Sequence, residues 1–251
     1  MSVLTRPAVL CLAALAPLAA ALGANPGGFT NQFPIAACDF QTRGGNAYLI
    51  LQVNRQLYLS NKRCKECVKE DGLVELWITV LPETRLVTFN HGGKQLTVRT
   101  RIFEEYETVD GELEEVSKNF LADCYPMRDV YYFGEDVFDG DGNPLPDAWL
   151  AGKDGAKPGI LVPDRAYLLG SRYFQEFAPN AKDRAEHTSM GFEVEVPAGT
   201  FKNCVEMTET TPLEPGSESI KVYCPNVGMV RDGNLELIRI YNNAQSPSVD
   251  D

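Results

Sequence analysis

Turn-forming residue pairs divide most of this chain into short runs of strand-forming residues, and this pattern constrains the fold more than any other feature. Gly92-Gly93, Asp110-Gly111 and Asp232-Gly233 each stand between two runs rich in β-branched and aromatic residues. An Asp-Gly pair flanked by alternating apolar and polar residues is the strongest short-range signal for a β-hairpin, because its tight turn favours positive φ angles. The pattern therefore predicts consecutive antiparallel strands.

Strand-like runs continue along the chain, and the only short helical candidate is 180–187. Consecutive hairpins favour a barrel over a sandwich. The predicted fold class is therefore all-β: an antiparallel meander that forms a barrel or half-barrel and is stapled by disulfides. The predicted strands are 47–59, 73–80, 85–89, 95–107, 113–121, 130–136, 166–177, 192–196, 201–208, 220–223 and 235–241.

The first 23 residues have the features of a cleaved secretory signal peptide. Arg6 forms a short basic region, and an apolar segment follows at 9–22. This segment is shorter than the roughly 20 residues that span a membrane, although an uncleaved membrane anchor is the alternative interpretation. The rest of the chain is predicted to form one antiparallel β domain, 24–243, and a polar, disordered tail, 244–251.

The charge of the chain argues against nucleic acid as a partner. It contains 23 Lys and Arg against 35 Asp and Glu, a formal net charge of −12. Cleavage at residue 23 removes only Arg6 and leaves 22 basic against 35 acidic residues, or −13. Such a surface repels phosphate backbones and anionic membranes. No later apolar run has the length of a membrane span, so we expect a secreted protein, either periplasmic or extracellular.

Six cysteines remain after the predicted cleavage, an even number that indicates disulfides in an exported protein. A hairpin folded about Glu214 places Cys204 opposite Cys224, because each lies ten residues from that position. Directly opposed residues of an antiparallel pair are close enough to be bridged. The sequence therefore predicts a Cys204–Cys224 disulfide.

Cys64 and Cys67 form a CxxC motif, which occurs in disulfides, metal sites and redox centres. Redox CxxC motifs begin a helix after a strand, whereas this motif is predicted to lie in a charged loop. The other cysteines are too scattered to complete a zinc site. Structural disulfides to Cys38 and Cys124 are the favoured interpretation, with metal binding and redox chemistry as alternatives.

Several short motifs are spread over residues 79–240: YFGED, GAKPG, EFAP, VPAGTF, TPLEPG and, at 224–230, a variant of APGVGLV. Together they resemble a family of secreted bacterial β-rich proteins of unknown function. The half that begins at VPAGTF is also similar to envelope β-sheet proteins of the lipoprotein-carrier type. The resemblance implies export and a lipoprotein-carrier-like or lipocalin-like barrel or half-barrel, and it implies no activity. Cys224 replaces the alanine that is usual in the family.

An acidic turn at 139–147 has side-chain oxygens at its first, third, fifth and ninth positions. Calcium binds six to eight such oxygens. However, Pro144 and Leu150 stand where an EF-hand loop requires Gly and Glu. A plain hairpin turn, in which Asp, Gly and Asn serve the backbone, is the other interpretation. Calcium is thus the one cofactor considered, with the candidate ligands Asp139, Asp141, Asn143 and Asp147.

A row of aromatic side chains could line an apolar ligand cavity or could form ordinary barrel core. We take the first interpretation as the hypothesis for a ligand site. Its predicted ligand-binding residues are Tyr131, Phe133, Trp149, Tyr173 and Phe177.

No catalytic residue is predicted. Glu135 and Asp136 are adjacent on one strand and therefore point to opposite faces. A two-carboxylate glycoside hydrolase would need a partner such as Glu176 or Glu193, and sequence alone does not place either of them.

The leading expectation is a secreted, non-catalytic envelope or extracellular protein that binds a small or lipid-like ligand. A calcium-binding structural or surface-interaction protein is the alternative, and a hydrolase that uses carboxylates is the second alternative. His91 and His187, the only histidines, are interpreted as solvated loop residues.

Overall fold

The structure, a computed structural model, describes residues 28–164 and 168–249. The predicted signal peptide, 1–23, lies outside the described residues. The elements in chain order are η1 (Ile35–Ala37), β1 (Asp39–Gln41), β2 (Arg55–Ser60), α1 (Lys65–Asp71), β3 (Val74–His91), β4 (Lys94–Val109), β5 (Glu112–Tyr125), β6 (Asp129–Asp139), β7 (Trp149–Leu150), β8 (Lys157–Val162), β9 (Arg172–Phe174), β10 (Glu176–Phe177), β11 (Arg184–Val196), β12 (Gly199–Thr210), β13 (Glu218–Cys224), β14 (Gly228–Asp232), β15 (Leu235–Asn242) and η2 (Pro247–Val249).

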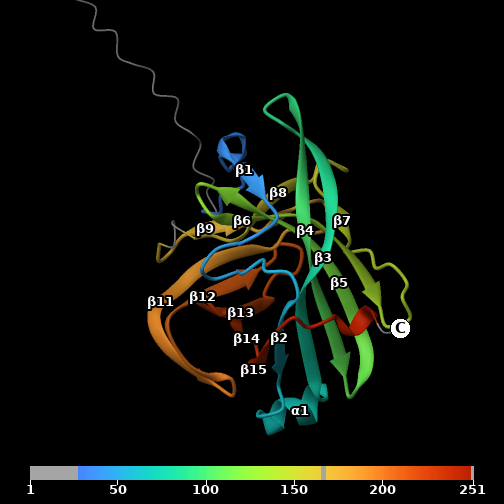
Figure 1. Ribbon diagram of the computed structural model, residues 1–251, viewed down its shortest axis with the longest axis vertical. Helices are drawn as coiled ribbons and strands as arrows, with labels where there is room; N and C mark the ends of the chain where they lie inside the picture. Colours follow the sequence, from blue (N-terminus) through green and yellow to red (C-terminus); the bar gives the residue numbers. More distant parts are fainter. Residues whose placement is uncertain (1–27, 165–167, 250–251) are drawn as a thin grey trace, which may run out of the picture.

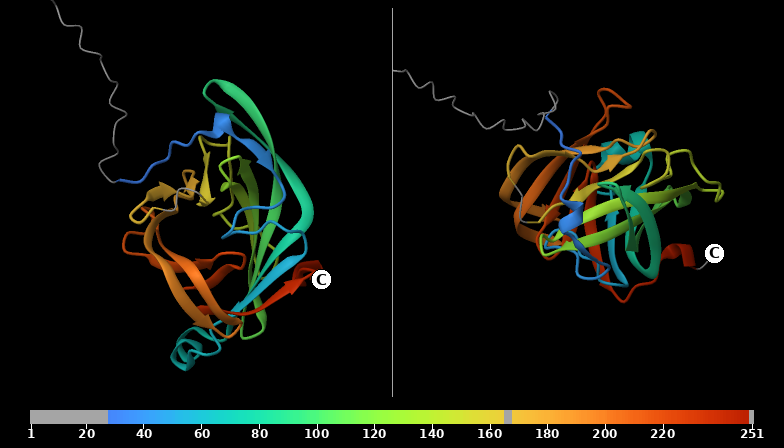
Figure 2. Two further views of the ribbon diagram at one scale, coloured as in Figure 1. Left: turned by 60° about the vertical axis from the view of Figure 1, so that its left-hand side comes forward. Right: turned by 90° about the horizontal axis from the view of Figure 1, so that it is seen from above.

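Within the described residues, fifteen strands form one antiparallel sheet that is nearly closed into a barrel (Figures 1 and 2). The sheet runs from β10 through β8, β6, β5, β4, β3, β2, β15, β14, β13, β12 and β11 to β9. Its two ends, β9 and β10, are separated by one residue of the chain. In the left view of Figure 2, β11 and β12 (orange) lie across the ring from β3 and β4 (teal to green). The predicted all-β barrel is confirmed.

The predicted turn pairs form the hairpins. Gly92-Gly93 joins β3 to β4, and Asp110-Gly111 joins β4 to β5. Asp110 has a φ of 53° and Gly111 one of 87°, which are the positive values that a tight hairpin turn requires. Asp232 pairs with Leu235 at the β14–β15 turn, where Gly233 has a φ of 52°.

Some predicted boundaries were wrong. The strands predicted at 73–80 and 85–89 are one strand, β3, which is interrupted only by a shift of its pairing with β4 between Val80 and Thr84. The helix predicted at 180–187 does not form, because Arg184 onwards belongs to β11. Ala185 and His187 are buried there on either side of the less buried Glu186, which is the two-residue period of a strand.

The N-terminal segment covers the outside of the barrel wall. The rings of Phe33 and Phe40 stand edge-on to Tyr131 of β6, at 6.0 and 5.4 Å between centroids. Phe133 of β6 packs against Phe40 and against Phe89 of β3. Burial of these aromatic rings places a hydrophobic layer between β6 and the N-terminal segment.

Two disulfides staple this framework. Cys204 and Cys224 are bonded and extend the β12–β13 register in which Val205 faces Tyr223, so the predicted pair is confirmed. Cys38 and Cys124 are bonded to each other and join the N-terminal segment to β5. They are therefore not the partners of the CxxC cysteines.

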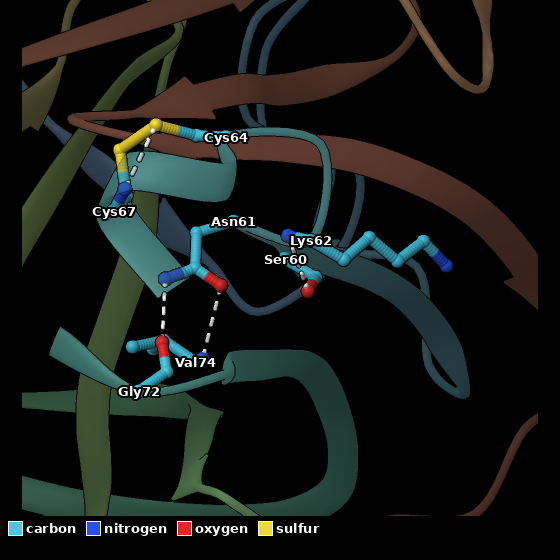
Figure 3. Close-up of a disulfide and its surroundings, with 7 residues drawn as sticks. All are labelled: Ser60, Asn61, Lys62, Cys64, Cys67, Gly72 and Val74. Carbon is cyan, nitrogen blue, oxygen red and sulfur yellow. Dashed lines mark hydrogen bonds between the residues drawn. A yellow bond between two sulfur atoms is a disulfide. The ribbon is translucent and has the colours of Figure 1, made fainter. Parts of the chain in front are cut away.

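The CxxC motif closes on itself at the first turn of a helix (Figure 3). Cys64 is bonded to Cys67 and precedes α1, where its Sγ accepts a hydrogen bond of 3.2 Å from the Cys67 backbone N–H. The expectation of a charged loop here was wrong. Asn61 holds the segment in place, since its side chain donates to the Gly72 carbonyl and accepts from the Val74 N–H.

The three bonds indicate an oxidising compartment. Among the described residues, no helix is both long and apolar enough to cross a membrane.

Residues 244–249, for which we predicted disorder, lie against the outside of β4. The buried carboxylate of Glu104 accepts hydrogen bonds from the hydroxyls of Ser246 and Ser248. The Gln245 carbonyl accepts a hydrogen bond of 3.1 Å from the Gln56 side chain. Since a buried carboxylate needs donors, these polar residues have a structural role that their composition did not reveal.

Candidate ligand-binding cavity

The inside of the barrel contains a cavity of about 460 Å³. Side chains on the inner faces of strands around the ring line it, together with residues of six connections. Alternation along each strand explains this arrangement, because every second residue points inward. The strand pattern therefore accounts for which side chains line the cavity, although these side chains do not resemble those of a packed core.

One side of the cavity is apolar. Leu57 of β2, Ile78 and Val80 of β3, and Met229 of β14 lie on this side, next to Val227. Strands β3, β2, β15 and β14 are consecutive in the sheet. Leu57 and Ile78 are directly opposed in the β2–β3 register, and these side chains form an apolar wall.

The remaining wall is strongly acidic. Five glutamates line the interior from five different strands, and three exposed acidic residues lie at its mouth. Against these eight carboxylates stand three basic side chains. The interior carboxylates are those of Glu105, Glu115, Glu135, Glu176 and Glu209, the mouth carboxylates are those of Asp147, Asp183 and Glu214, and the bases are Arg55, Lys182 and Lys221.

Lys221 is engaged by two carboxylates. Its Nζ lies 3.2 Å from Glu209 and 3.5 Å from Asp232. Burial opposes the charge of Lys221, but the attraction of Asp232 and Glu209 outweighs it, so the pKa of Lys221 rises well above its usual value. The Gln175 side chain donates a further hydrogen bond of 2.6 Å to Glu209. Lys221 and Glu209 thus neutralise each other inside the wall.

Arg55 also has a partner, which is a backbone carbonyl group. Its guanidinium donates a hydrogen bond of 2.7 Å to the Val227 carbonyl. Burial lowers the pKa of Arg55. The two basic groups inside the cavity therefore have partners already.

Among the described residues, only Glu209 of the five interior glutamates has an ion-pair partner, and Glu115 accepts a hydrogen bond of 2.8 Å from the Ser117 hydroxyl. Glu105, Glu135 and Glu176 form no ion pair within residues 28–164 and 168–249. Burial raises the pKa of Glu105 to about 7, although Lys221 partly opposes the shift. Burial likewise raises the pKa of Glu135 to about 7, against a hydrogen bond of 2.7 Å from the Tyr132 hydroxyl.

Glu176 is the most deeply buried of the three, with 8% of its surface exposed. Burial and then the neighbouring carboxyl of Glu135 raise the pKa of Glu176 well above its usual value. The two carboxyl groups thus oppose each other's ionisation. The structure brings together the two carboxyl groups that sequence analysis could not place, while Asp136 faces Arg85 in an ion pair.

Gln175 leaves a hydrogen-bond acceptor unused in the same wall. Its amide nitrogen donates to Glu209, but its Oε1 is buried and has no hydrogen-bond partner in the described part of the chain. The residue is only 2% exposed and lines the cavity. A buried polar atom without a partner costs about 1–3 kcal/mol, so this acceptor is a candidate contact for a ligand.

The five aromatic residues predicted to bind a ligand are not among the described residues that line this cavity. Tyr131 and Phe133 point to the other side of β6, into the layer under the N-terminal segment. Tyr132, between them, faces the cavity instead. Sequence alternation identifies the two faces of such a strand but cannot tell which is inside the barrel when both are buried.

The other three aromatics lie in separate places. Trp149 packs edge-on to Tyr132, at 5.3 Å between ring centroids, and lines a shallower hollow beside the cavity. Tyr173 is buried with its hydroxyl 3.1 Å from His187 Nε2. Phe177 packs against Phe174. The five residues therefore do not form one surface.

His187 is 2% exposed, so the expectation of a solvated loop histidine was wrong for this residue. Burial lowers the pKa of His187 to about 4. The ring is therefore neutral at physiological pH.

The acidic turn at 139–147 folds around its own first residue. Asp139 Oδ1 accepts hydrogen bonds from the backbone N–H groups of Asp141 and Asn143, at 3.0 and 2.8 Å, and from the Asn143 side chain. Asp147 lines the mouth of the cavity. No group of three or more His, Cys, Asp or Glu residues in the described ranges could hold a metal ion. Calcium binding by this turn stays a prediction.

Comparisons with family models, with curated proteins and with solved structures each gave no match to this chain. The family resemblance of residues 79–240 therefore stays a prediction.

Proposed function

We propose that this protein binds a small molecule inside its barrel. The observation that carries the proposal is the cavity of about 460 Å³, which is within the range of roughly 300–1,000 Å³ that is usual for ligand pockets. The predicted signal peptide and the three disulfides support a secreted protein, periplasmic or extracellular, that carries or sequesters its ligand.

The composition of the cavity wall supports binding over a purely structural role. A protein core is close-packed and largely apolar, whereas this interior keeps Glu105, Glu135 and Glu176 around open space. Burying carboxyl groups without ion-pair partners costs stability. Such a wall is typical of a site whose polar groups obtain partners from a ligand.

Matched tryptophan substitutions test the proposal. Leu161 lines the cavity, whereas Leu86 of β3 is 55% exposed and is not among the lining residues. N-phenyl-1-naphthylamine, an uncharged dye that becomes fluorescent in apolar sites, is the probe. We expect the wild-type protein and Leu86→Trp to bind the dye, and Leu161→Trp to lose binding because the indole fills the cavity. Absence of dye binding to the wild-type protein, or equal binding to both variants, would contradict the proposal.

Hydrolysis by carboxylates is a second candidate function, and the proximity of Glu135 and Glu176 favours it. One carboxyl group with a raised pKa and a neighbouring carboxylate are the requirements of acid–base glycoside hydrolysis. Activity on a panel of aryl glycosides that disappears in Glu176→Gln but persists in Glu193→Gln would support it. Glu193 is the matched control, since it lies on the surface beside Lys202.

A further inference from the structure

The cavity presents an excess of acceptors over donors, and this excess identifies the chemistry of its ligand. Glu105, Glu135 and Glu176 come from three strands, β4, β6 and β10, and no group of three such residues in the described ranges could hold a metal ion. Gln175 adds the buried Oε1 that has no hydrogen-bond partner among the described residues. All four groups can accept hydrogen bonds from a ligand that carries several N–H donors.

Two of the three described bases that line the cavity are already engaged, and the third, Lys182, lies beside Asp183 at its mouth. Lys221 is held between Glu209 and Asp232, and Arg55 donates to the Val227 carbonyl. Glu105, Glu135 and Glu176 therefore form no ion pair among the described residues, and a cationic ligand would supply the charge that they lack. A distributed group of N–H donors matches acceptors on several strands better than a bare ion does, because a metal ion needs ligands that converge on one point.

The apolar wall, in which Ile78 is the cross-strand neighbour of Glu105, restricts the ligand further. Leu57, Ile78, Val80 and Met229 offer apolar surface within the same 460 Å³. Burying the apolar part of a ligand there contributes about 25 cal/mol for each Å² removed from water. The site thus combines a cation-binding side with an apolar side.

We infer that the ligand is a small organic cation, an amine, amidine or guanidine with an apolar portion, bound between the acidic wall and the apolar wall. This inference rests on the proposed function and specifies its ligand class.

Binding of such a cation is coupled to release of protons. Glu105 and Glu135 are partly protonated near pH 7 in the unliganded protein, and a cation favours their ionised forms. Affinity therefore rises with pH between about 5.5 and 8. The charged and titratable groups around Glu105 are Glu115, Glu209, Lys221 and Asp232. Those around Glu135 are Glu105, Glu115, Tyr132, Glu176 and Asp183.

Three indole compounds of similar size and different charge test the inference by calorimetry on the purified protein. Tryptamine is a cation throughout this pH range, tryptophol is neutral, and indole-3-propionate is an anion. We expect tryptamine to bind at least about tenfold more tightly than tryptophol, a difference of about 1.4 kcal/mol, and indole-3-propionate to bind most weakly. The affinity for tryptamine should increase from pH 5.5 to 8, with proton release detected in buffers of different ionisation enthalpy.

Isosteric variants test whether the preference for tryptamine over tryptophol arises in the cavity. Glu105→Gln and Glu135→Gln should each weaken tryptamine binding about tenfold and leave tryptophol binding nearly unchanged. Glu193→Gln, the same change on the outer surface, should bind as the wild type does. Equal tryptamine affinity in all of these proteins would overturn the inference.

The outcomes separate the ligand class from the proposed function. If the uncharged dye binds but tryptophol or indole-3-propionate equals tryptamine, the cation inference is wrong and the binding function stands. If neither the dye nor any of the three indoles binds, both are wrong.

Discussion

Strand β6 has two faces with opposite physical characters. On one face, Tyr131 and Phe133 are fully buried against aromatic rings of the N-terminal segment. On the other face, Tyr132 and Glu135 line an acidic cavity. The side chains of the first face are fully packed against other residues of the chain. The second face contains carboxyl groups without ion-pair partners. The comparison indicates that the outer layer stabilises the fold and the inner surface serves binding.

The largest effect is expected from the outer face. Phe133→Ala should lower the free energy of unfolding by about 3–5 kcal/mol, because it removes a fully buried ring and leaves a cavity. Tyr132→Phe on the inner face keeps the ring and removes only the hydroxyl, so it should cost far less. Denaturant unfolding of both variants measures the difference, and a smaller loss for Phe133→Ala would contradict the division of roles.

The disulfides provide a second comparison of the outer layer with a peripheral site. Replacing Cys38 and Cys124 by serine should cost about 2–4 kcal/mol, because the bond joins residues 86 apart in sequence. The Cys64–Cys67 bond spans three residues and is partly exposed, so its removal should cost less. It should also be the first bond reduced by dithiothreitol, since thiolates reach it directly.

Mass spectrometry after alkylation follows the order of reduction. Earlier loss of the buried Cys204–Cys224 bond would show that exposure does not control this order.

A smaller effect of opposite sign is expected from the inner face. The raised pKa of Glu105, about 7, means that its proton stabilises the folded state below the unfolded pKa, and that this contribution is lost as pH rises through 7. Glu105→Gln should therefore raise the melting temperature at pH 8, by about 2–6 °C, and have little effect at pH 4. Differential scanning calorimetry at both pH values checks this, and destabilisation at pH 8 would contradict it.

The sequence predicted the hairpins and one disulfide correctly, because local residue patterns determine these features. Asp110-Gly111 formed its hairpin because positive φ angles favour Asp and Gly, and Cys204 met Cys224 because hairpin register follows from chain symmetry about the turn. The helix at Lys65–Asp71 was missed because seven residues show too little periodicity.

The cavity was much harder to predict. The proximity of Glu135 and Glu176 depends on the long-range pairing of β8 with both β6 and β10. Tyr132 faces the cavity, whereas Tyr131 and Phe133 face away from it because the N-terminal segment covers them. No pattern in the sequence predicted this covering layer. One signal was available: Glu115, Ser117 and Asn119, which line the cavity, occupy alternate positions of one predicted strand, and such a polar row is unusual for a barrel interior.

A crystal structure of the protein with tryptamine tests the central claim most directly. The account predicts tryptamine inside the barrel, with its ammonium group within hydrogen-bond distance of Glu105, Glu135 or Glu176 and its indole against Ile78 and Val80. Tryptamine bound only on the outer surface, or an interior filled by protein side chains, would contradict it.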